Sequence, residues 1–455
     1  LIVVAIVLFK VAAAQEVFFD LLPGSERFIY NEKTGVHRLI GTVNFKYQGN
    51  TMYCDSAHYH EAKKLVYAYG NVHVIKEEVN LFCDSLFYDG NIELAKLWSN
   101  VRVRDNEYKL ITDSLDYKAD KNVGIYRNGG VIERILKDEV LTSTIGYIYT
   151  ESKDMFFSND VKYNSKKLNV ITDTLQFKYE QNKALFFGPT NITTYDDSLQ
   201  VESVIYTEKG WYNTETEEAE LENNASIKSK ENRINGDYLY SNPTKGLSIG
   251  KGNVYFEDTV QHLIFSGNYF FSDDSTKTVL LTDKALVRSI SKKDTLYIHA
   301  DTLFAFKDSL DEFKQVKGYY NVQFFKNDLQ GKCDSMFYDR KIGKMELFEE
   351  PIVWAIGEKS EKSELKGDFI EMLLKGDSLI QKMNIIGNST VLLEVDSGMY
   401  YNQIGGKDIT AFFSNNDIVR TDVKGNARTV FFPENKDKET DSSIVIKRLG
   451  MNRIY

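Results

Sequence analysis

The feature that most constrains this chain is a short phrase that recurs along it at steps of 29 or 30 residues. The clearest copies are Cys54-Asp55-Ser56, Cys83-Asp84-Ser85 and Cys333-Asp334-Ser335, which contain all three cysteines of the sequence. Related copies place a polar residue at positions 113, 143, 173 and 202, and beyond residue 202 the steps lengthen to between 31 and 40 residues. A regular period of this size is typical of repeat proteins, in which each unit buries its apolar face against its neighbours.

A second phrase alternates with the first and divides each repeat into two stretches. It reads Gly70-Asn71-Val72, Ser99-Asn100-Val101 and Gly252-Asn253-Val254 in three of its copies. Polar turn signals such as Asp89-Gly90-Asn91 follow every ten to fifteen residues, and no long helical period lies between them. The chain is rich in Tyr (28) and Phe (28) and has only 5 Pro, a composition that favours strands. The sequence therefore predicts an all-β fold of stacked antiparallel hairpins, with two strands in each unit.

The cysteine position of the repeat is interpreted as a small buried slot. Thr, Ala, Val or Gly occupies it in the other copies, which a nucleophile or a metal ligand would not tolerate. Cys54 and Cys83 lie one repeat apart, so a disulfide between stacked units stays open as an alternative. Cys54, His58 and His60 form the tightest group of metal-ligating residue types, but the remaining histidines are scattered, and we expect no metal and no other cofactor.

The alternation of apolar residues changes phase inside each phrase. In the copy at residues 81–88, Leu81 and Cys83 share one face of a regular strand, whereas Leu86 and Tyr88 share the other. A bulge or bend near Asp84 would turn both pairs inward. We therefore expect a bend at the acidic residue, where the Asp has a structural role.

Charge and the first residues bear on location and partners. A net charge of −10 and a pI of about 5.4 argue against nucleic-acid binding, which needs a basic surface. Residues 1–14 resemble the apolar core and small-residue cleavage site of a signal peptide whose basic start is missing, which predicts export. We expect regular repeats over residues 16–202 and less regular repeats over residues 203–455.

Taken together, the alternating Gly-Asn-Val-x-Val and Cys/Ala-Asp-x-Leu-x-Tyr phrases resemble the OstA/LptA-like family of lipopolysaccharide-transport proteins, from about Gly41 to about Asn426. The resemblance implies an elongated β-jellyroll of antiparallel strands that forms a V-shaped trough. It also implies a periplasmic protein, either free or associated with the outer membrane, that shields the acyl chains of lipid A. Its partners would then be lipopolysaccharide and other jellyroll components, joined end to end by strand pairing.

The predicted trough would be lined by inward apolar residues of the best copies. The candidates are Leu86, Tyr88, Leu115, Tyr117, Ile145, Tyr147, Leu175 and Phe177. The alternative is that these residues fill a closed core, as in a secreted β-solenoid scaffold or adhesin that binds no lipid. We expect no catalytic residues, because the chain lacks a Gly-x-Ser-x-Gly, P-loop or His-Glu-x-x-His motif and each Asp belongs to a series of equivalents.

Overall fold

The computed structural model describes residues 20–432, apart from 23, 48–49, 293, 358–361, 376–378 and 396–398. The signal peptide predicted over residues 1–14 lies outside the described residues. Within them the secondary structure consists of β-strands and three short 3₁₀-helices. The chain divides into two compact units, unit 1 ending at Lys230 and unit 2 beginning at Glu231, and each is described here by itself. The change in repeat regularity expected after residue 202 stays a prediction.

Unit 1 contains nineteen strands and two 3₁₀-helices in its described part. They are β1 (Asp20–Leu22), β2 (Arg27–Asn31), β3 (Val36–Tyr47), β4 (Asn50–His60), β5 (Leu65–Lys76), β6 (Val79–Asp89), β7 (Leu94–Arg104), β8 (Tyr108–Lys118), η1 (Ala119–Lys121), β9 (Val123–Tyr126), β10 (Gly130–Arg134), β11 (Glu139–Ser143), β12 (Ile145–Tyr149), β13 (Met155–Asn164), β14 (Leu168–Lys178), η2 (Tyr179–Gln181), β15 (Lys183–Phe186), β16 (Thr190–Tyr195), β17 (Val201–Thr207), β18 (Lys209–Asn213) and β19 (Ala219–Ser229).

Unit 2 contains fifteen strands and one 3₁₀-helix in its described part. They are β20 (Asn232–Asn242), η3 (Pro243–Lys245), β21 (Leu247–Asp258), β22 (Leu263–Asp273), β23 (Thr278–Ile290), β24 (Thr295–Lys307), β25 (Phe313–Lys326), β26 (Leu329–Asp339), β27 (Lys344–Phe348), β28 (Ile352–Ile356), β29 (Lys362–Lys366), β30 (Phe369–Lys375), β31 (Leu379–Val395), β32 (Tyr400–Ser414), β33 (Asp417–Lys424) and β34 (Arg428–Val430).

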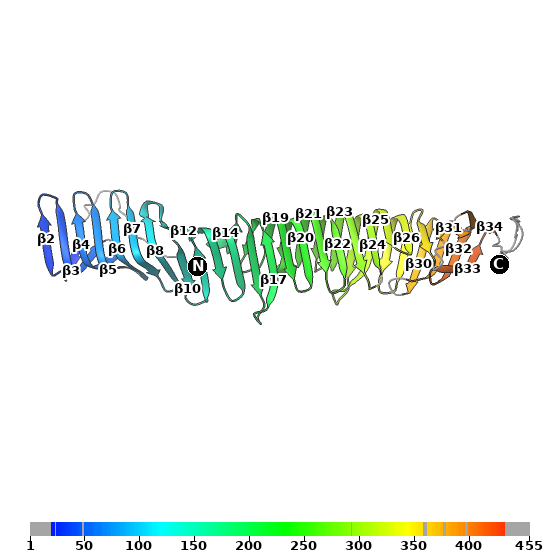
Figure 1. Cartoon of the computed structure of the whole chain (residues 1–455), viewed down its shortest axis with the longest axis horizontal. Helices are drawn as coiled ribbons and strands as arrows, with labels where there is room; N and C mark the ends of the chain where they lie inside the picture. The colour runs from blue at the N-terminus through cyan, green and yellow to red at the C-terminus, as the bar shows by residue number, and fades with distance from the viewer. Residues whose placement is uncertain are drawn as a thin grey trace. The chain divides into compact units, whose positions relative to one another are not determined.

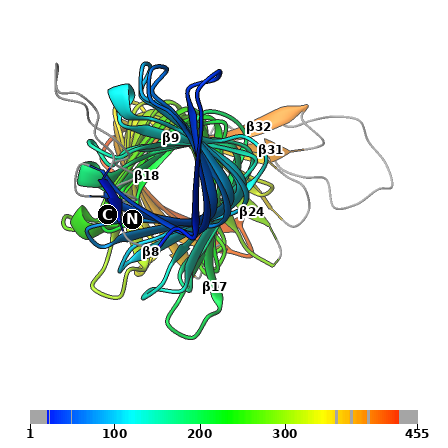
Figure 2. The ribbon, with the colours of Figure 1, turned by 90° about the vertical axis from the view of Figure 1, so that its left-hand side faces the viewer.

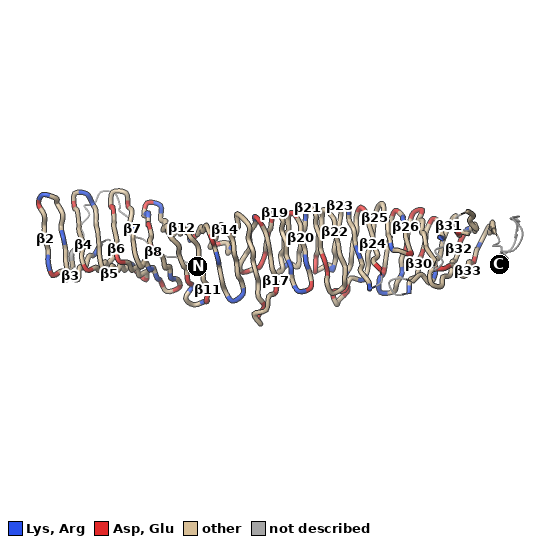
Figure 3. The backbone as a smooth tube through the Cα atoms, in the orientation of Figure 1, with Lys and Arg blue, Asp and Glu red and all other residues tan. Residues whose placement is uncertain are grey.

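Neighbouring strands pair antiparallel in each unit. From β3 to β8 each strand pairs with the next one along the chain, and the same holds from β20 to β26. Figure 1 shows the strands of each unit side by side in chain order. Figure 3 shows that Lys, Arg, Asp and Glu gather at the hairpin turns. The predicted all-β fold of stacked antiparallel hairpins is confirmed.

Each long strand bends near its middle, and both of its halves bury their apolar residues on the same side. In β6 the buried residues are Val79, Leu81 and Cys83 before the bend and Leu86 and Tyr88 after it. The pairing register between β6 and β7 shifts at the bend, between Phe82 and Ser85, as a bulge requires. The predicted bend at the Asp is therefore confirmed. We call this bend the corner. The half of the strand that holds Cys83 is called arm A, and the half that holds Tyr88 is called arm B. Figure 2 shows the blue strands of unit 1 bent into two such arms.

The corner also explains the second phrase of the repeat. Gly70 and Asn71 both adopt positive φ angles, of 72° and 46°, which turn the chain at this point. Asn71 then donates a side-chain hydrogen bond to the carboxylate of Asp55 on the neighbouring strand at 2.9 Å. A Cβ at position 70 would lie 2.3 Å from that carboxylate, so glycine is required by both space and conformation.

The same pairing recurs along both units. We call each pair a corner clip, and the pairs, with donor–acceptor distances between 2.7 and 3.2 Å, are Asn71–Asp55, Asn100–Asp84, Asn224–Glu208, Asn253–Asp237, Asn321–Asp301 and Asn388–Asp368. The two phrases of the repeat are therefore two halves of one hydrogen-bonded corner. The sequence indicated a local role for the Asp; its partner is the Asn of the next strand.

The cysteine slot lies on the inner face of arm A, beside the corner. Cys54, Cys83 and Cys333 are buried and free, and burial raises the pKa of each thiol to about 12. The open alternative of a Cys54–Cys83 disulfide is not realised, because Val72 of β5 lies between β4 and β6 in the same row. The cysteines therefore act as small core residues.

Candidate functional site

The described part of unit 1 contains a cavity of about 680 Å³ between arms A and B. Apolar side chains of both arms form its floor, and charged residues of the hairpin tips form its rim. The lining comprises Tyr108, Ile132, Arg134, Lys137, Glu139, Leu141, Met155, Phe157, Tyr163, Ser165, Lys166, Lys167, Leu168, Val170, Leu175, Phe177, Tyr179, Glu180, Asn182, Ala184, Thr214 and Glu215. We call the side where the tips of the two arms face each other the mouth. A volume in this range is typical of a site for one small ligand, roughly 300–1,000 Å³.

The cavity lies where several strands are interrupted at the corner. β9 and β10 are separate strands, as are β11 and β12, and β15 and β16. Buried hydroxyls close the gaps in the hydrogen bonding: Thr112 donates to the carbonyl oxygen of Gly129 at 2.7 Å, and Thr172 and Thr190 share a hydrogen bond of 2.8 Å. Thr112 and Thr172 occupy the cysteine slot of the repeat, so the slot keeps its place in the core although its chemistry changes.

The arm A side of the mouth is organised around Arg134, whose side chain is 19% exposed. Its Nε donates to Oε1 of Glu107 at 2.7 Å, and its Nη1 lies 3.4 Å from Oε2 of Glu139. The guanidinium also lies over the ring of Tyr108, 5.4 Å from its centre. Burial acts to raise the pKa of Glu107, whereas the hydrogen bond and the charge of Arg134 act to lower it.

Lysines of the two neighbouring tips extend this rim. Lys166 pairs with Asp138 at 3.3 Å and Lys167 pairs with Asp197 at 2.7 Å, and all four side chains are largely exposed. Exposed ion pairs of this kind contribute roughly 0–1 kcal/mol, so both ammonium groups can exchange their partners for another anion at little cost. Each of these pairs joins neighbouring tips of arm A and leaves the mouth between the arms open.

Tyr163 lies inside this rim and stays neutral. Burial, and then the nearby carboxylate of Glu139, raise the pKa of the Tyr163 hydroxyl to about 12. Opposite it, the arm B tip at η2 contributes Tyr179 and Glu180. The site thus combines an apolar interior with a rim whose basic side chains gather on arm A, an arrangement suited to holding an amphiphile.

Six of the predicted lining residues lie on the inner face. Leu86, Tyr88, Leu115, Tyr117, Leu175 and Phe177 are all buried. Leu175 and Phe177 line the cavity, whereas the other four pack in the interior of β6 and β8. Their role in lipid binding stays a prediction.

Ile145 and Tyr147 are half-buried and lie on the opposite face of β12 from buried Gly146 and Ile148. Ser143 fills the cysteine slot in this copy, because it lies opposite Gly130, which in turn lies opposite the slot residue Thr112. The sequence repeat had placed the slot one position earlier. A shift by one residue exchanges the two faces of a strand. The structure therefore does not bring Ile145 and Tyr147 together with the other six candidates.

The repeat phrases did not indicate several residues of the site. Met155 and Phe157 lie in β13, and Arg134 and Glu139 flank the turn between β10 and β11. A usable signal was the run of apolar residues Met155-Phe156-Phe157. In the pairing of β13 with β14, Met155 lies opposite Phe177 and Phe157 lies opposite Leu175. No sequence pattern marked Arg134 as an inward-facing cation.

Among the described residues, no helix is long and apolar enough to cross a membrane. No group of three or more His, Cys, Asp or Glu side chains in the same residues could hold a metal ion. Cys54 faces the interior from arm A, whereas His58 and His60 lie on arm B beyond the corner, so this sequence group is not assembled.

The fold and the cavity define a class: an all-β repeat protein with an apolar interior between two arms of each strand. Residues 24–173 match the family model of OstA-like proteins. The resemblance to the OstA/LptA-like family is therefore confirmed, and the match covers the strands from β2 to β13 and part of β14.

Comparison with solved structures finds LptH of Pseudomonas aeruginosa, described as the LptA homologous periplasmic component of the lipopolysaccharide transport device. The identity is 15%, and the match covers 24% of this chain and 75% of LptH with a TM-score of 0.21. A TM-score this low does not by itself establish a common fold. No curated protein matches the sequence.

Proposed function

We propose that this chain is a periplasmic lipopolysaccharide-transport protein whose unit 1 shields acyl chains of lipid A in the cavity between its arms. The observation that carries the proposal is the cavity of about 680 Å³, which is apolar inside and has Arg134 and three lysines at its rim. Part of its lining falls within residues 24–173, which match OstA-like proteins. Each methylene moved from water into such an interior contributes roughly 0.8 kcal/mol, so acyl chains supply the binding free energy.

The charges of the rim support an anionic amphiphile. Lys137, Lys166 and Lys167 lie on the arm A side, where a phosphate of the lipid head group would replace the weak partners of Lys166 and Lys167. The sugars would stay in solvent beyond the mouth. This orientation requires no catalytic group and no cofactor.

The test is to fill the cavity. Ala184 lines it between Phe177 of β14 and Tyr212 of β18. We expect Ala184→Phe to keep the fold and lower lipopolysaccharide binding at least tenfold, because the new ring occupies acyl space. The matched control is Leu185→Phe, on the outer face of the same strand. Unchanged binding in a folded Ala184→Phe variant would contradict the proposal.

We also propose that another jellyroll component docks end to end at β2. Among the described residues β2 pairs only with β3, and all five residues of β2 are exposed, so its outer edge can accept a strand. We expect Ile29→Lys in β2 to reduce recovery of a jellyroll partner from periplasmic extracts. The control is Ile92→Lys, an exposed isoleucine in a hairpin turn. Equal recovery with both variants would contradict docking at β2.

A further inference from the structure

In unit 2, side chains at the hairpin tips join the two arms across the mouth at two places. Gln261 lies in the turn between β21 and β22, at an arm A tip, and Phe313 begins β25 at an arm B tip. Nε2 of Gln261 donates to the carbonyl oxygen of Asp311 at 3.2 Å, and its Oε1 accepts from the backbone N–H of Phe313 at 2.7 Å. One amide side chain thus joins the two arms.

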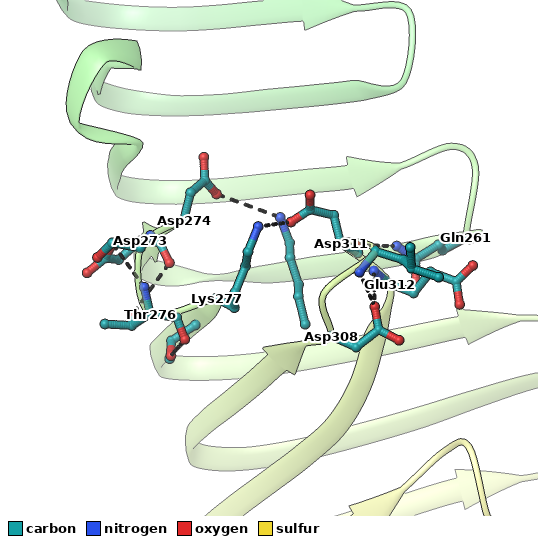
Figure 4. Close-up of polar contacts among 12 residues, drawn as sticks. Gln261, Asp273, Asp274, Thr276, Lys277, Asp308, Asp311 and Glu312 are labelled. Carbon is teal, nitrogen blue, oxygen red and sulfur yellow. Dashed lines mark hydrogen bonds and ion pairs between the residues drawn. The ribbon is translucent and has the colours of Figure 1, made fainter.

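The surroundings of Gln261 fix this contact. Its Nε2 also donates to Asp258 Oδ2 at 3.1 Å, which holds the side chain in place from its own arm. On the arm B side, Lys277 of the adjacent turn pairs with Asp311 at 2.5 Å. Figure 4 shows Gln261 reaching the loop that carries Asp308, Asp311 and Glu312. The contact is therefore held by a hydrogen bond on arm A and by an ion pair on arm B.

Aromatic rings fill the space behind it. Phe265 of arm A lies 4.9 Å from Phe313 of arm B, and Phe256 of arm A lies 5.3 Å from Phe270 of arm B, between ring centres. Phe265, Phe270 and Phe313 are buried in one apolar cluster that extends from Val254 to Phe413. At these strands the two arms pack directly against each other.

A second contact closes the mouth nearer the end of the described chain. Asn416, in the arm B turn between β32 and β33, donates to Asp328 in the arm A turn between β25 and β26. Its side-chain oxygen accepts from the backbone N–H of Ile380 at 3.0 Å, and Asn416 is buried. Close by, a Cβ on Gly357 of arm A would lie 1.6 Å from the carboxylate of Asp417, so the tips also touch there.

From these contacts we propose that lipid occupies unit 1 alone, and that Gln261 and Asn416 act as latches that keep the interior of unit 2 closed to it. The inference rests on the proposed function, because it assigns the extent of the same lipid site. Unit 2 then holds no lipid, and lipid reaches and leaves the cavity through the mouth of unit 1.

The test uses the full chain and lipopolysaccharide whose acyl chains carry diazirine groups, with crosslinked peptides mapped by mass spectrometry. We expect crosslinks in β13–β15 and none in β21–β25 of the unmodified protein. We expect the double variant Gln261→Ala, Asn416→Ala to gain crosslinks in β21–β25 at a level at least several-fold above the unmodified protein.

The matched control is the double variant Gln315→Ala, Asn384→Ala. Gln315 donates to Asp339 at 2.8 Å and Asn384 donates to Glu371 at 2.8 Å, so each loses an amide–carboxylate bond within arm B only. Crosslinks in both units of the unmodified protein would overturn the confinement to unit 1 and leave the proposed function standing. Crosslinks in neither unit would contradict the proposed function itself. A folded latch variant without new crosslinks in unit 2 would overturn the role of the latches.

Discussion

Asn100 holds a backbone conformation that few side chains adopt, with a φ of 56°, and uses its side chain to bind Asp84 at 2.7 Å. The repeat of Gly-Asn and Asp-Ser phrases follows from this corner clip: one phrase supplies the left-handed turn and the donor, the other the acceptor. The sequence predicted that the Asp is structural and that the strand bends there. It did not predict the partner, because two residues sixteen positions apart become neighbours only once the strand register is set.

The corner clip can be separated into its conformational and hydrogen-bonding parts. We expect Asn100→Gly, which keeps the left-handed conformation, to lower the free energy of unfolding by about 1 kcal/mol, the net value of the lost hydrogen bond. Asn100→Ala should cost about 2 kcal/mol, because Ala adds the strain of that conformation. Urea denaturation followed by circular dichroism measures both values. Equal stability of Asn100→Gly and the unmodified protein would show that the clip contributes nothing.

The three cysteine thiols should be inert in the folded protein. Burial raises the pKa of each to about 12, from an ordinary value of 9.0, so the reactive thiolate is absent at pH 8. We expect a thiol reagent at pH 8 to modify none of the three in native protein and all three in urea.

The same pKa shift makes stability depend on alkaline pH. The folded pKa is raised, so the contribution to stability is complete below pH 9 and is lost as pH rises from 9 towards 12. We expect the urea midpoint to fall over that range, and to fall less in a Cys83→Ala variant. An equal fall in both proteins would contradict burial as the source of the shift.

At the scale of the element, β12 shows how far a sequence repeat can be followed. In regular copies such as β6, β8 and β14, the cysteine slot and the apolar residues after it have the same spacing around the bend. These strands therefore bury the residues that the phrase predicted. In the copy at 142–147 the slot moves by one residue to Ser143, and every side chain after it changes face. A pattern of Thr-Ser-Thr at the slot is equally compatible with either register, so only the pairing of β11 with β10 decides it.

The register of β12 can be tested with two neighbouring substitutions. Ile148 is fully buried, and Ile148→Ala should lower the free energy of unfolding by about 3 kcal/mol through lost burial and a new cavity. Tyr147 is half-buried on the other face, and Tyr147→Ala should cost about 1 kcal/mol or less. The two values come from urea titrations of the same preparation. The reverse order would contradict the observed register.

At the scale of the whole molecule, the described residues form a cavity between the arms in unit 1 and side-chain contacts between the arms in unit 2. Sequence repeats predicted stacked β-hairpins along the chain, and each unit contains such a stack. The family resemblance implied an apolar trough along the chain, but the repeats did not locate the cavity of about 680 Å³ around β13–β15 and did not indicate that Gln261 and Asn416 join the arms in unit 2. Both features depend on side chains at hairpin tips, which meet only across the mouth and follow no repeat.

This difference should appear in hydrogen exchange of the full chain. We expect backbone amides of β13–β15 to exchange at least tenfold faster than those of β22–β24, because fewer packed side chains stabilise the strands beside the cavity. Lipopolysaccharide should slow exchange in β13–β15 and leave β22–β24 unchanged. Uniform protection without lipid, or uniform slowing with it, would contradict the difference between the units.

The measurement that tests the central claim most directly is site-specific photo-crosslinking of the full chain to lipopolysaccharide. A photoreactive amino acid at position 175 places the probe on the cavity floor, and the same probe at exposed Gln181 in η2 serves as the control. The account predicts crosslinks from position 175 and not from position 181. Absence of crosslinks from position 175 in a folded, β-rich protein would contradict a lipid path through unit 1.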